Sequence, residues 1–64
     1  MKNLVPIVRK NGITIYGRVI GSNGRLGQFI LYNSHTGEQI DYALFSEAEK
    51  HMNSAIYLMT QGRN

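Results

Sequence analysis

Residues 39–59 read QIDYALFSEAEKHMNSAIYLM, and within this stretch the spacing of apolar residues changes from that of a strand to that of a helix. The first part alternates, which predicts a strand over 39–45. In the second part apolar residues return every three or four positions, which predicts a helix over about 47–60. Its apolar stripe consists of Ala48, Met52, Ala55, Ile56 and Met59. Because such a stripe has to be covered, we expect the helix to pack on a sheet.

The same stretch predicts where the helix begins and ends. Ser46 and Glu49 have the spacing of a capping box, in which the serine hydroxyl accepts from the Glu49 amide and the glutamate reaches back to the amide of the serine. Gly62 is placed to end the helix, since glycine readily takes the left-handed conformation found at helix C-termini.

Three further strands are expected upstream, over 4–9, 13–20 and 28–33. Pro6 cannot donate a ladder hydrogen bond, so the first of them should be an edge strand. Asn11-Gly12 is the strongest short signature of a type I′ hairpin turn. The connections are short, which favours antiparallel neighbours. The sequence therefore predicts an α+β fold, a small antiparallel β-meander of three to four strands with one C-terminal α-helix packed on one face, in a single domain over 1–64.

Alternation within these strands predicts which side chains share each face of the sheet. The face toward the helix should carry Ile13, Ile15, Val19, Phe29 and Leu31. The opposite face should carry Thr14, Tyr16, Arg18, Gln28, Ile30 and Tyr32.

Composition limits the class of protein. The chain has 64 residues and no cysteine, which excludes a disulfide scaffold, and it has no apolar run of the ~18 residues that a membrane span requires. We expect a cytoplasmic protein that is not an enzyme and has neither a cofactor nor a metal site. Glu47 and His51 are spaced i, i+4, but a solvated helix pair explains them better than a zinc site, which needs about four ligands.

The net charge of +3 is unevenly distributed along the chain. Residues 1–33 hold five Lys or Arg and no acidic residue, whereas residues 34–64 hold four Asp or Glu against two Lys or Arg. This asymmetry favours a surface that attracts nucleic-acid phosphate, DNA or RNA. The alternative is that a basic half simply balances an acidic half.

The expected nucleic-acid-binding residues combine arginine or lysine with tyrosine, which supply phosphate contacts and stacking surfaces. They are Arg9, Lys10, Tyr16, Arg18, Arg25 and Tyr32. The glycine-rich segment 21–27 is expected to be a mobile hairpin tip that carries Arg25. Two plainer interpretations remain open: a flexible loop with an incidental arginine, and an ordinary solvent-facing sheet surface.

The rival hypothesis is a protein-binding inhibitor or adaptor of the kind that phages and mobile elements encode, acting through the sheet face or a strand edge. Ile30 and Tyr57 are then the expected partner contacts, because both are expected to be exposed. Burial of Ile20, Ile30 and Tyr57 in a homodimer is a further alternative.

Two families share parts of this pattern. The segment from Phe29 to Met59, with its Thr36-Gly37-Glu38 turn and Ser46-Glu47-Ala48 helix start, resembles the arm-type DNA-binding domain of phage tyrosine recombinases, whose sheet enters the major groove. This chain adds an N-terminal strand and has few basic residues in its last strand. Asn11-Gly12-Ile13 with Gly17 and residues 28–31 is similar to the strand pattern of Sm-like RNA-binding proteins, which lack a long C-terminal helix.

Overall fold

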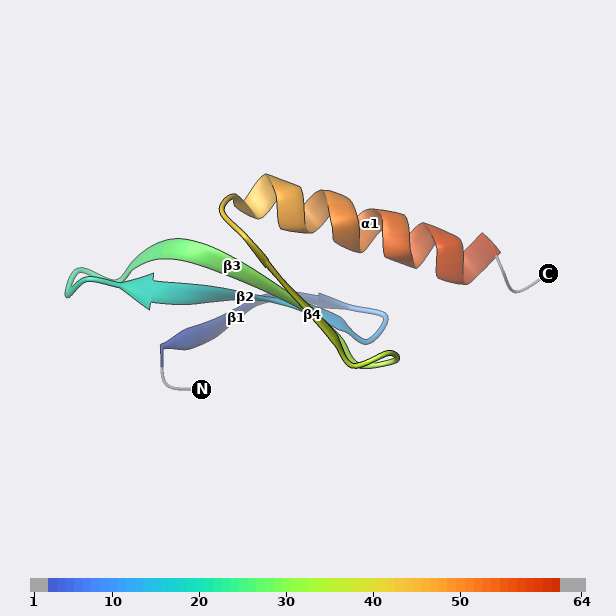
Figure 1. Cartoon of the computed structure of the whole chain (residues 1–64), viewed down its shortest axis with the longest axis horizontal. Coiled ribbons are helices and arrows are strands. Elements are labelled where there is room, and N and C mark those ends of the chain that lie inside the picture. Colours follow the sequence, from blue (N-terminus) through green and yellow to red (C-terminus); the bar gives the residue numbers. More distant parts are fainter. Residues whose placement is uncertain (1–2, 62–64) are drawn as a thin grey trace.

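The expected fold class is confirmed: the protein is a four-stranded antiparallel sheet with one C-terminal helix packed on it (Figure 1). The computed structural model describes residues 3–61. The strands follow one another in the order β1-β2-β3-β4, so each pairs with its neighbour in sequence. The elements are β1 (Leu4–Lys10), β2 (Ile13–Ile20), β3 (Arg25–Asn33), β4 (Glu38–Tyr42) and α1 (Phe45–Gln61).

The β1–β2 hairpin forms as its turn residues predict. Asn11 and Gly12 have φ values of 51° and 82°, and a positive φ at both central positions is the mark of a type I′ turn. The register shifts between Pro6 and Val8, which leaves Ile7 as a bulge. β1 is an edge strand, as expected for a strand that contains Pro6.

The segment 21–27 contains a hairpin turn between two strands, as expected, but the loop is shorter than expected, because β3 begins at Arg25. Gly21 and Gly24 take positive φ values of 74° and 76° and close the turn within four residues. Arg25 then pairs with Ile20, and the register shift beside Arg18 absorbs Gly27 as a bulge. A high glycine content therefore marked both a tight turn and a bulge, and Arg25 lies in a paired strand.

The junction of β4 and α1 also differs from expectation. The strand ends at Tyr42 and the helix begins at Phe45. The Leu44 carbonyl accepts the amides of Glu47 at 3.2 Å and Ala48 at 3.3 Å, so Leu44 is the N-cap residue. The capping box is thus wrong: within residues 3–61 no hydrogen bond joins the Ser46 hydroxyl to the Glu49 amide. The expected cap at Gly62 lies outside the described residues.

Aromatic packing explains why the helix begins early. The Phe45 ring meets the Phe29 ring edge to face, with centroids 5.8 Å apart and planes at 67°. Pairs of this kind contribute beyond the area they bury. The contact joins the first turn of α1 to β3. A strand that continued to residue 45 would not place the Phe45 ring against Phe29.

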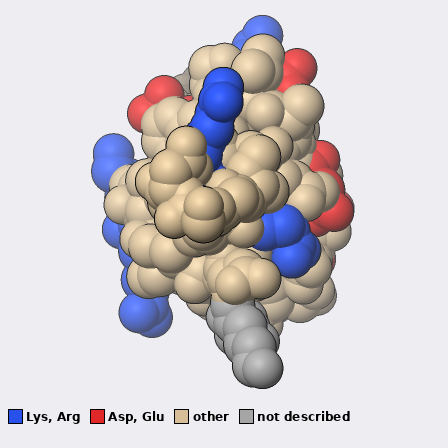
Figure 2. Space-filling model, turned by 90° about the vertical axis from the view of Figure 1, so that its left-hand side faces the viewer, with Lys and Arg blue, Asp and Glu red and all other residues tan. Residues whose placement is uncertain are grey.

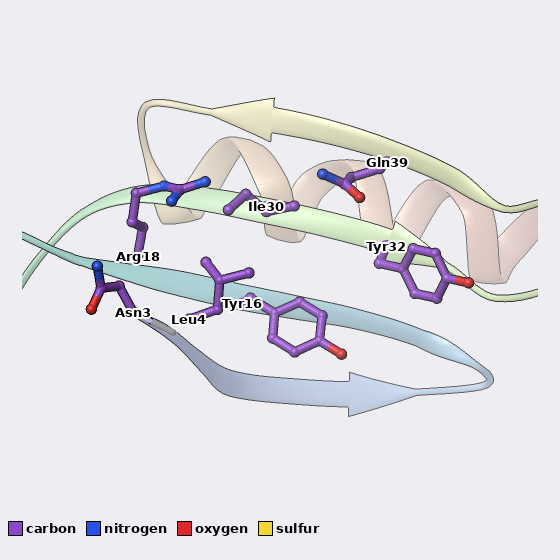
Figure 3. Close-up of a pocket in the computed structure, with 7 residues that line it drawn as sticks. All are labelled: Asn3, Leu4, Tyr16, Arg18, Ile30, Tyr32 and Gln39. Atoms are coloured by element: carbon purple, nitrogen blue, oxygen red, sulfur yellow. The ribbon is translucent and has the colours of Figure 1, made fainter. Parts of the chain in front are cut away.

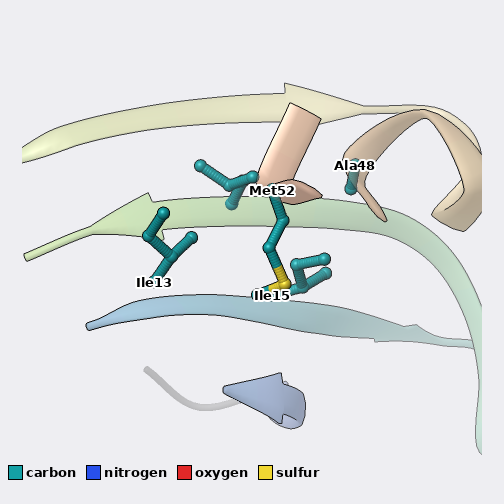
Figure 4. Packing of buried hydrophobic residues seen from close by; sticks show 5 residues of the cluster. Ile13, Ile15, Ala48 and Met52 are labelled. Carbon is teal, nitrogen blue, oxygen red and sulfur yellow. The ribbon is translucent and has the colours of Figure 1, made fainter. Parts of the chain in front are cut away.

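The core lies between α1 and one face of the sheet, as the predicted stripe requires. Ile13, Ile15 and Leu31 on the sheet pack against Ala48 and Met52 on the helix, and all five are buried (Figure 4). Ala55, Ile56 and Met59 continue the stripe but are only partly buried. The expected helix register is confirmed, and of the expected core face Ile13, Ile15, Phe29 and Leu31 join this core, whereas Val19 does not.

The helix and the sheet are offset along the long axis of the molecule. The C-terminal end of α1 extends past the β1–β2 and β3–β4 turns, while the β2–β3 hairpin projects the other way without helix cover (Figure 1). The protein measures 48 × 20 × 15 Å and its radius of gyration is 12.5 Å. A compact chain of this length is expected near 11 Å. The offset therefore leaves exposed surface that a closer packing would bury.

Candidate nucleic-acid interface

The face of the sheet away from α1, here called the outward face, holds most of the predicted binding residues. Directly opposed residues of antiparallel strands project to the same face. The register pairs Arg18 with Gln28, Tyr16 with Ile30 and Thr14 with Tyr32. The same alternation places on the outward face Leu4, Pro6 and Arg9 of β1, Ile20 and Arg25 beside the β2–β3 turn, and Gln39 and Asp41 of β4.

Two adjoining hollows indent the outward face, and Tyr16 and Tyr32 line both of them. The larger hollow is about 610 Å³ in volume and has Arg18 in its wall. The smaller is about 290 Å³ and has Arg9 in its wall. Figure 3 shows the two tyrosine rings on neighbouring strands and the Arg18 side chain farther along the larger hollow. Arg18 thus lies two residues from Tyr16 along β2, whereas Arg9 lies on β1 opposite Thr14, which separates it from Tyr32.

The expectation that Ile30 is an exposed contact is wrong. Its side chain lies on the outward face but is only 2% exposed. β3 is an interior strand, so Ile30 has Tyr16 beside it on β2 and Asp41 beside it on β4. Ile30 lines the larger hollow together with Leu4, Tyr16 and Tyr32. Ile30 therefore gives the hollow an apolar base and does not present a surface patch.

A chain of polar side chains runs across three strands at one end of the larger hollow. Arg18 Nε donates to Gln28 Oε1 at 2.9 Å, and Gln28 Nε2 donates to Asp41 Oδ2 at 3.1 Å. The bonds fix the arginine without pairing it directly to the carboxylate. The remaining guanidinium N–H groups make no hydrogen bond within residues 3–61, so the Arg18 fork keeps donors for a ligand.

The other predicted cations are divided between the two faces. Arg9 is exposed beside the smaller hollow, and Arg25 is exposed at the tip of the β2–β3 hairpin. Lys10 pairs with Ile13, whose side chain lies under the helix, so the register assigns Lys10 to the helix side. Lys10 therefore does not lie on the outward face with Arg9, Arg18 and Arg25.

Seen from the end of the β2–β3 hairpin, uncharged surface separates the Lys and Arg side chains, and the Asp and Glu side chains lie toward the margins (Figure 2).

On the outward face the charges of the strand residues nevertheless favour an anion. Arg9, Arg18 and Arg25 lie there against Asp41 alone. The sequence-based asymmetry of charge is therefore retained on one side of the sheet, although spread along its length.

Tyr57, the other predicted partner contact, lies far from these hollows on α1. It is 61% exposed and adjoins the exposed Leu58. Its exposure agrees with the helical register. The neighbouring Leu58 was not singled out by the stripe argument, because a single apolar residue on the polar face of a helix carries little weight.

The two histidines serve the fold. His35 Nε2 donates to the Asn11 carbonyl at 2.8 Å and so joins the β3–β4 turn to the β1–β2 turn. His51 Nδ1 hydrogen-bonds the Tyr42 hydroxyl, and the two rings meet edge to face. The expected partner of His51 was Glu47, whereas the structure gives it Tyr42. Within the described residues no three His, Cys, Asp or Glu side chains come close enough to hold a metal ion.

Sequence reasoning missed several residues that shape the hollows. Asn3, Leu4 and Gln39 line the larger one, and Ser34 lines the smaller. Alternation along one strand cannot place residues of β1 and β4 next to Tyr16 and Tyr32, because that requires the register between strands. Gln28 had been assigned to the correct face, but nothing in its position indicated the bonds to Arg18 and Asp41.

Comparison of the chain with protein-family models, with curated proteins and with solved structures finds no match. The similarities to recombinase arm domains and to Sm-like proteins therefore depend on the quoted residues alone. In the part of the chain that the structure describes, α1 is too short and too polar to cross a membrane.

Proposed function

We propose that this protein binds nucleic acid through the outward face of its sheet and acts as a cytoplasmic binding protein without enzymatic activity. The observation that carries the proposal is the placement of Tyr16 and Tyr32 in two adjoining hollows that Arg18 and Arg9 also line. Tyrosine offers a flat ring for base stacking, and arginine offers several donors to phosphate or base edges.

The charge balance supports the same conclusion. Three arginines against one aspartate on the outward face give a surface that attracts phosphate, while the acidic residues Glu47 and Glu49 lie on α1, on the other side of the sheet. Phosphate contacts supply most of the sequence-independent affinity for nucleic acid.

The test is binding of labelled DNA and RNA oligonucleotides at several salt concentrations, starting near 50 mM. Replacing Arg9 and Arg18 together by glutamine should weaken binding and flatten its log–log salt dependence by about 0.7 to 0.9 per lost phosphate contact. The matched control is Lys10→Gln with Lys50→Gln, which removes the same charge from the helix side and should leave the slope nearly unchanged. Absence of binding by the wild type at low salt, or equal effects of the two double variants, would contradict the proposal.

A protein-binding inhibitor or adaptor is the second candidate, and a specific observation favours it. On the helix side of the β2–β3 hairpin, Ile7 and Leu26 close over Gly17, and both are exposed, as is the nearby Val5. The affinity of a protein partner for this apolar surface should be nearly independent of salt concentration. Retention from a host lysate that persists after nuclease treatment, together with no binding of oligonucleotides, would place this candidate first. The edge of β1 is less suited to strand addition, because Pro6 and the Ile7 bulge interrupt it.

A further inference from the structure

Building on the proposed function, we infer that the outward face takes unpaired bases of single-stranded nucleic acid, with one base against Tyr16 and one against Tyr32, and with phosphates at Arg9 and Arg18.

The two tyrosines are placed to act together. Tyr16 is directly opposite Ile30, and Tyr32 lies two residues farther along β3, so the tyrosines are diagonal neighbours. Such neighbours are separated by roughly 7–8 Å on one face of a sheet. Both rings adjoin the same two hollows. Two successive bases therefore have one ring each within a short length of strand.

The chemical groups on the face suit an unpaired nucleotide segment. The middle is apolar and aromatic, because Ile30 and Leu4 adjoin the tyrosines in the larger hollow. Arg18 lines the larger hollow on the side of the β2–β3 hairpin, and Arg9 lines the smaller hollow from the edge strand β1. Gln39 supplies an amide, which can donate to and accept from a base edge. We therefore expect bases to contact the apolar centre of the outward face and phosphates to contact Arg9 and Arg18.

A duplex fits this face less well for two reasons. In a duplex the bases are stacked on one another, so they expose no face on which the rings of Tyr16 and Tyr32 could stack. The major groove is about 12 Å wide and admits a two-stranded ribbon. The three spacings across this four-stranded sheet amount to about 14 Å before side chains are added, and the surface is hollowed at its centre. Four-stranded sheets that stack bases on exposed aromatic side chains bind single strands in this way.

The experiment is fluorescence anisotropy with labelled oligothymidylate and oligouridylate of about 12 nucleotides, a length that exceeds a two-base site. A hairpin duplex of the same stem length is measured in parallel at about 50 mM salt. We expect at least one of the single strands to bind about tenfold more tightly than the duplex. The comparison of thymidylate with uridylate then distinguishes DNA from RNA, and tighter binding of either one supports the inference.

The deciding variants change ring and hydroxyl separately. Tyr32 is 37% exposed, so Tyr32→Leu removes the stacking ring at a position that is not in the core. It should weaken single-strand binding by about 5- to 100-fold without altering the salt slope, since no phosphate contact is lost. Tyr32→Phe keeps the ring and should bind within about twofold of the wild type. Tyr57→Leu is the control, because Tyr57 is an exposed tyrosine on α1.

Thermal melting of each variant shows that binding is compared between folded proteins. Should Tyr32→Leu melt far below the wild type, single-strand binding is compared between Tyr16→Leu, which lacks the ring, and Tyr16→Phe, which keeps it. Tyr32→Phe remains the ring-retaining variant at the other position. Equal or tighter binding of the duplex, with no effect of Tyr32→Leu, would overturn the single-strand inference and leave nucleic-acid binding intact. Failure of every oligonucleotide to bind would overturn both.

Discussion

The two ends of the sheet are built differently, although each carries a glycine-containing hairpin turn. At one end the β1–β2 turn is held by the β3–β4 turn: the Ser34 hydroxyl and amide both donate to the Gly12 carbonyl, at 2.7 and 3.0 Å, and His35 Nε2 donates to the Asn11 carbonyl. At the other end the Gly21–Gly24 turn of the β2–β3 hairpin projects beyond the helix (Figure 1). We therefore expect stability to be concentrated where α1 covers the sheet and where the turns join.

Side-chain burial changes in the same direction along the single strand β3. Leu31 lies under α1 and is 1% exposed, whereas Leu26 lies on the same side of β3 near the projecting turn and is 37% exposed. One strand therefore passes from a dry core to an exposed apolar surface within five residues. Substitutions along it can measure how far the core extends.

The largest expected effect is at the helix-covered end. Met52→Asp places a carboxylate in a core where Met52 is 1% exposed, and we expect a loss of at least about 4 kcal/mol in the free energy of unfolding. For a domain of this size that loss should abolish the cooperative melt followed by circular dichroism. Lys50→Asp on the exposed side of α1 should cost less than about 1 kcal/mol. Equal stability of the two variants would contradict the helix register.

The next effect compares the two leucines of β3. Leu31→Ala should lower the free energy of unfolding by about 2 to 5 kcal/mol, because it leaves a cavity under α1. Leu26→Ala should lower it by less than about 1 kcal/mol, since its side chain is already partly in water. Urea denaturation of both variants measures the difference. A loss at Leu26 as large as that at Leu31 would mean that the hairpin end is covered in solution, as a homodimer would do.

A smaller effect distinguishes the two turns. A Cβ at Gly12 would lie 2.5 Å from His35 Nε2 at a φ of +82°, whereas a Cβ at Gly24 would meet nothing within 4 Å at a φ of +76°. Gly24→Ala should therefore cost only the conformational penalty of about 1–2 kcal/mol, and Gly12→Ala should cost at least about 1 kcal/mol more. Thermal melts measure both. In a His35→Ala background the difference should largely disappear, and its persistence would show that the side chain of His35 is not the cause.

The smallest expected effect tests the junction of the turns directly. Ser34→Ala removes the hydroxyl that donates to the Gly12 carbonyl but leaves the Ser34 amide bonded to the same atom. We expect a loss of about 1 kcal/mol, which corresponds to a melting temperature lower by roughly 4–8 °C. Ser22→Ala in the projecting turn is the control and should change it by less than about 3 °C. Equal shifts for the two serines would show that the junction adds no stability.

Features that depend on a few neighbouring residues follow from the amino-acid sequence alone. The type I′ turn follows from Asn11-Gly12, because these two residues tolerate positive φ. The helix and its buried side follow from the spacing of Ala48 and Met52, because helical geometry brings residues four apart onto one face. The two faces of β2 follow from strict alternation. These were predictable because the physical cause is local.

Features that join distant segments depend on the tertiary structure. Ile30 is buried in an interior strand that has β2 on one side and β4 on the other, and no pattern within 28–33 reports that position. The two hollows require the register of β1 and β4 against β2 and β3. The contacts of His35 with Asn11 and of Arg18 with Gln28 span 24 and 10 residues. Their positions result from the packing of the whole sheet, because each depends on where another strand or turn is placed.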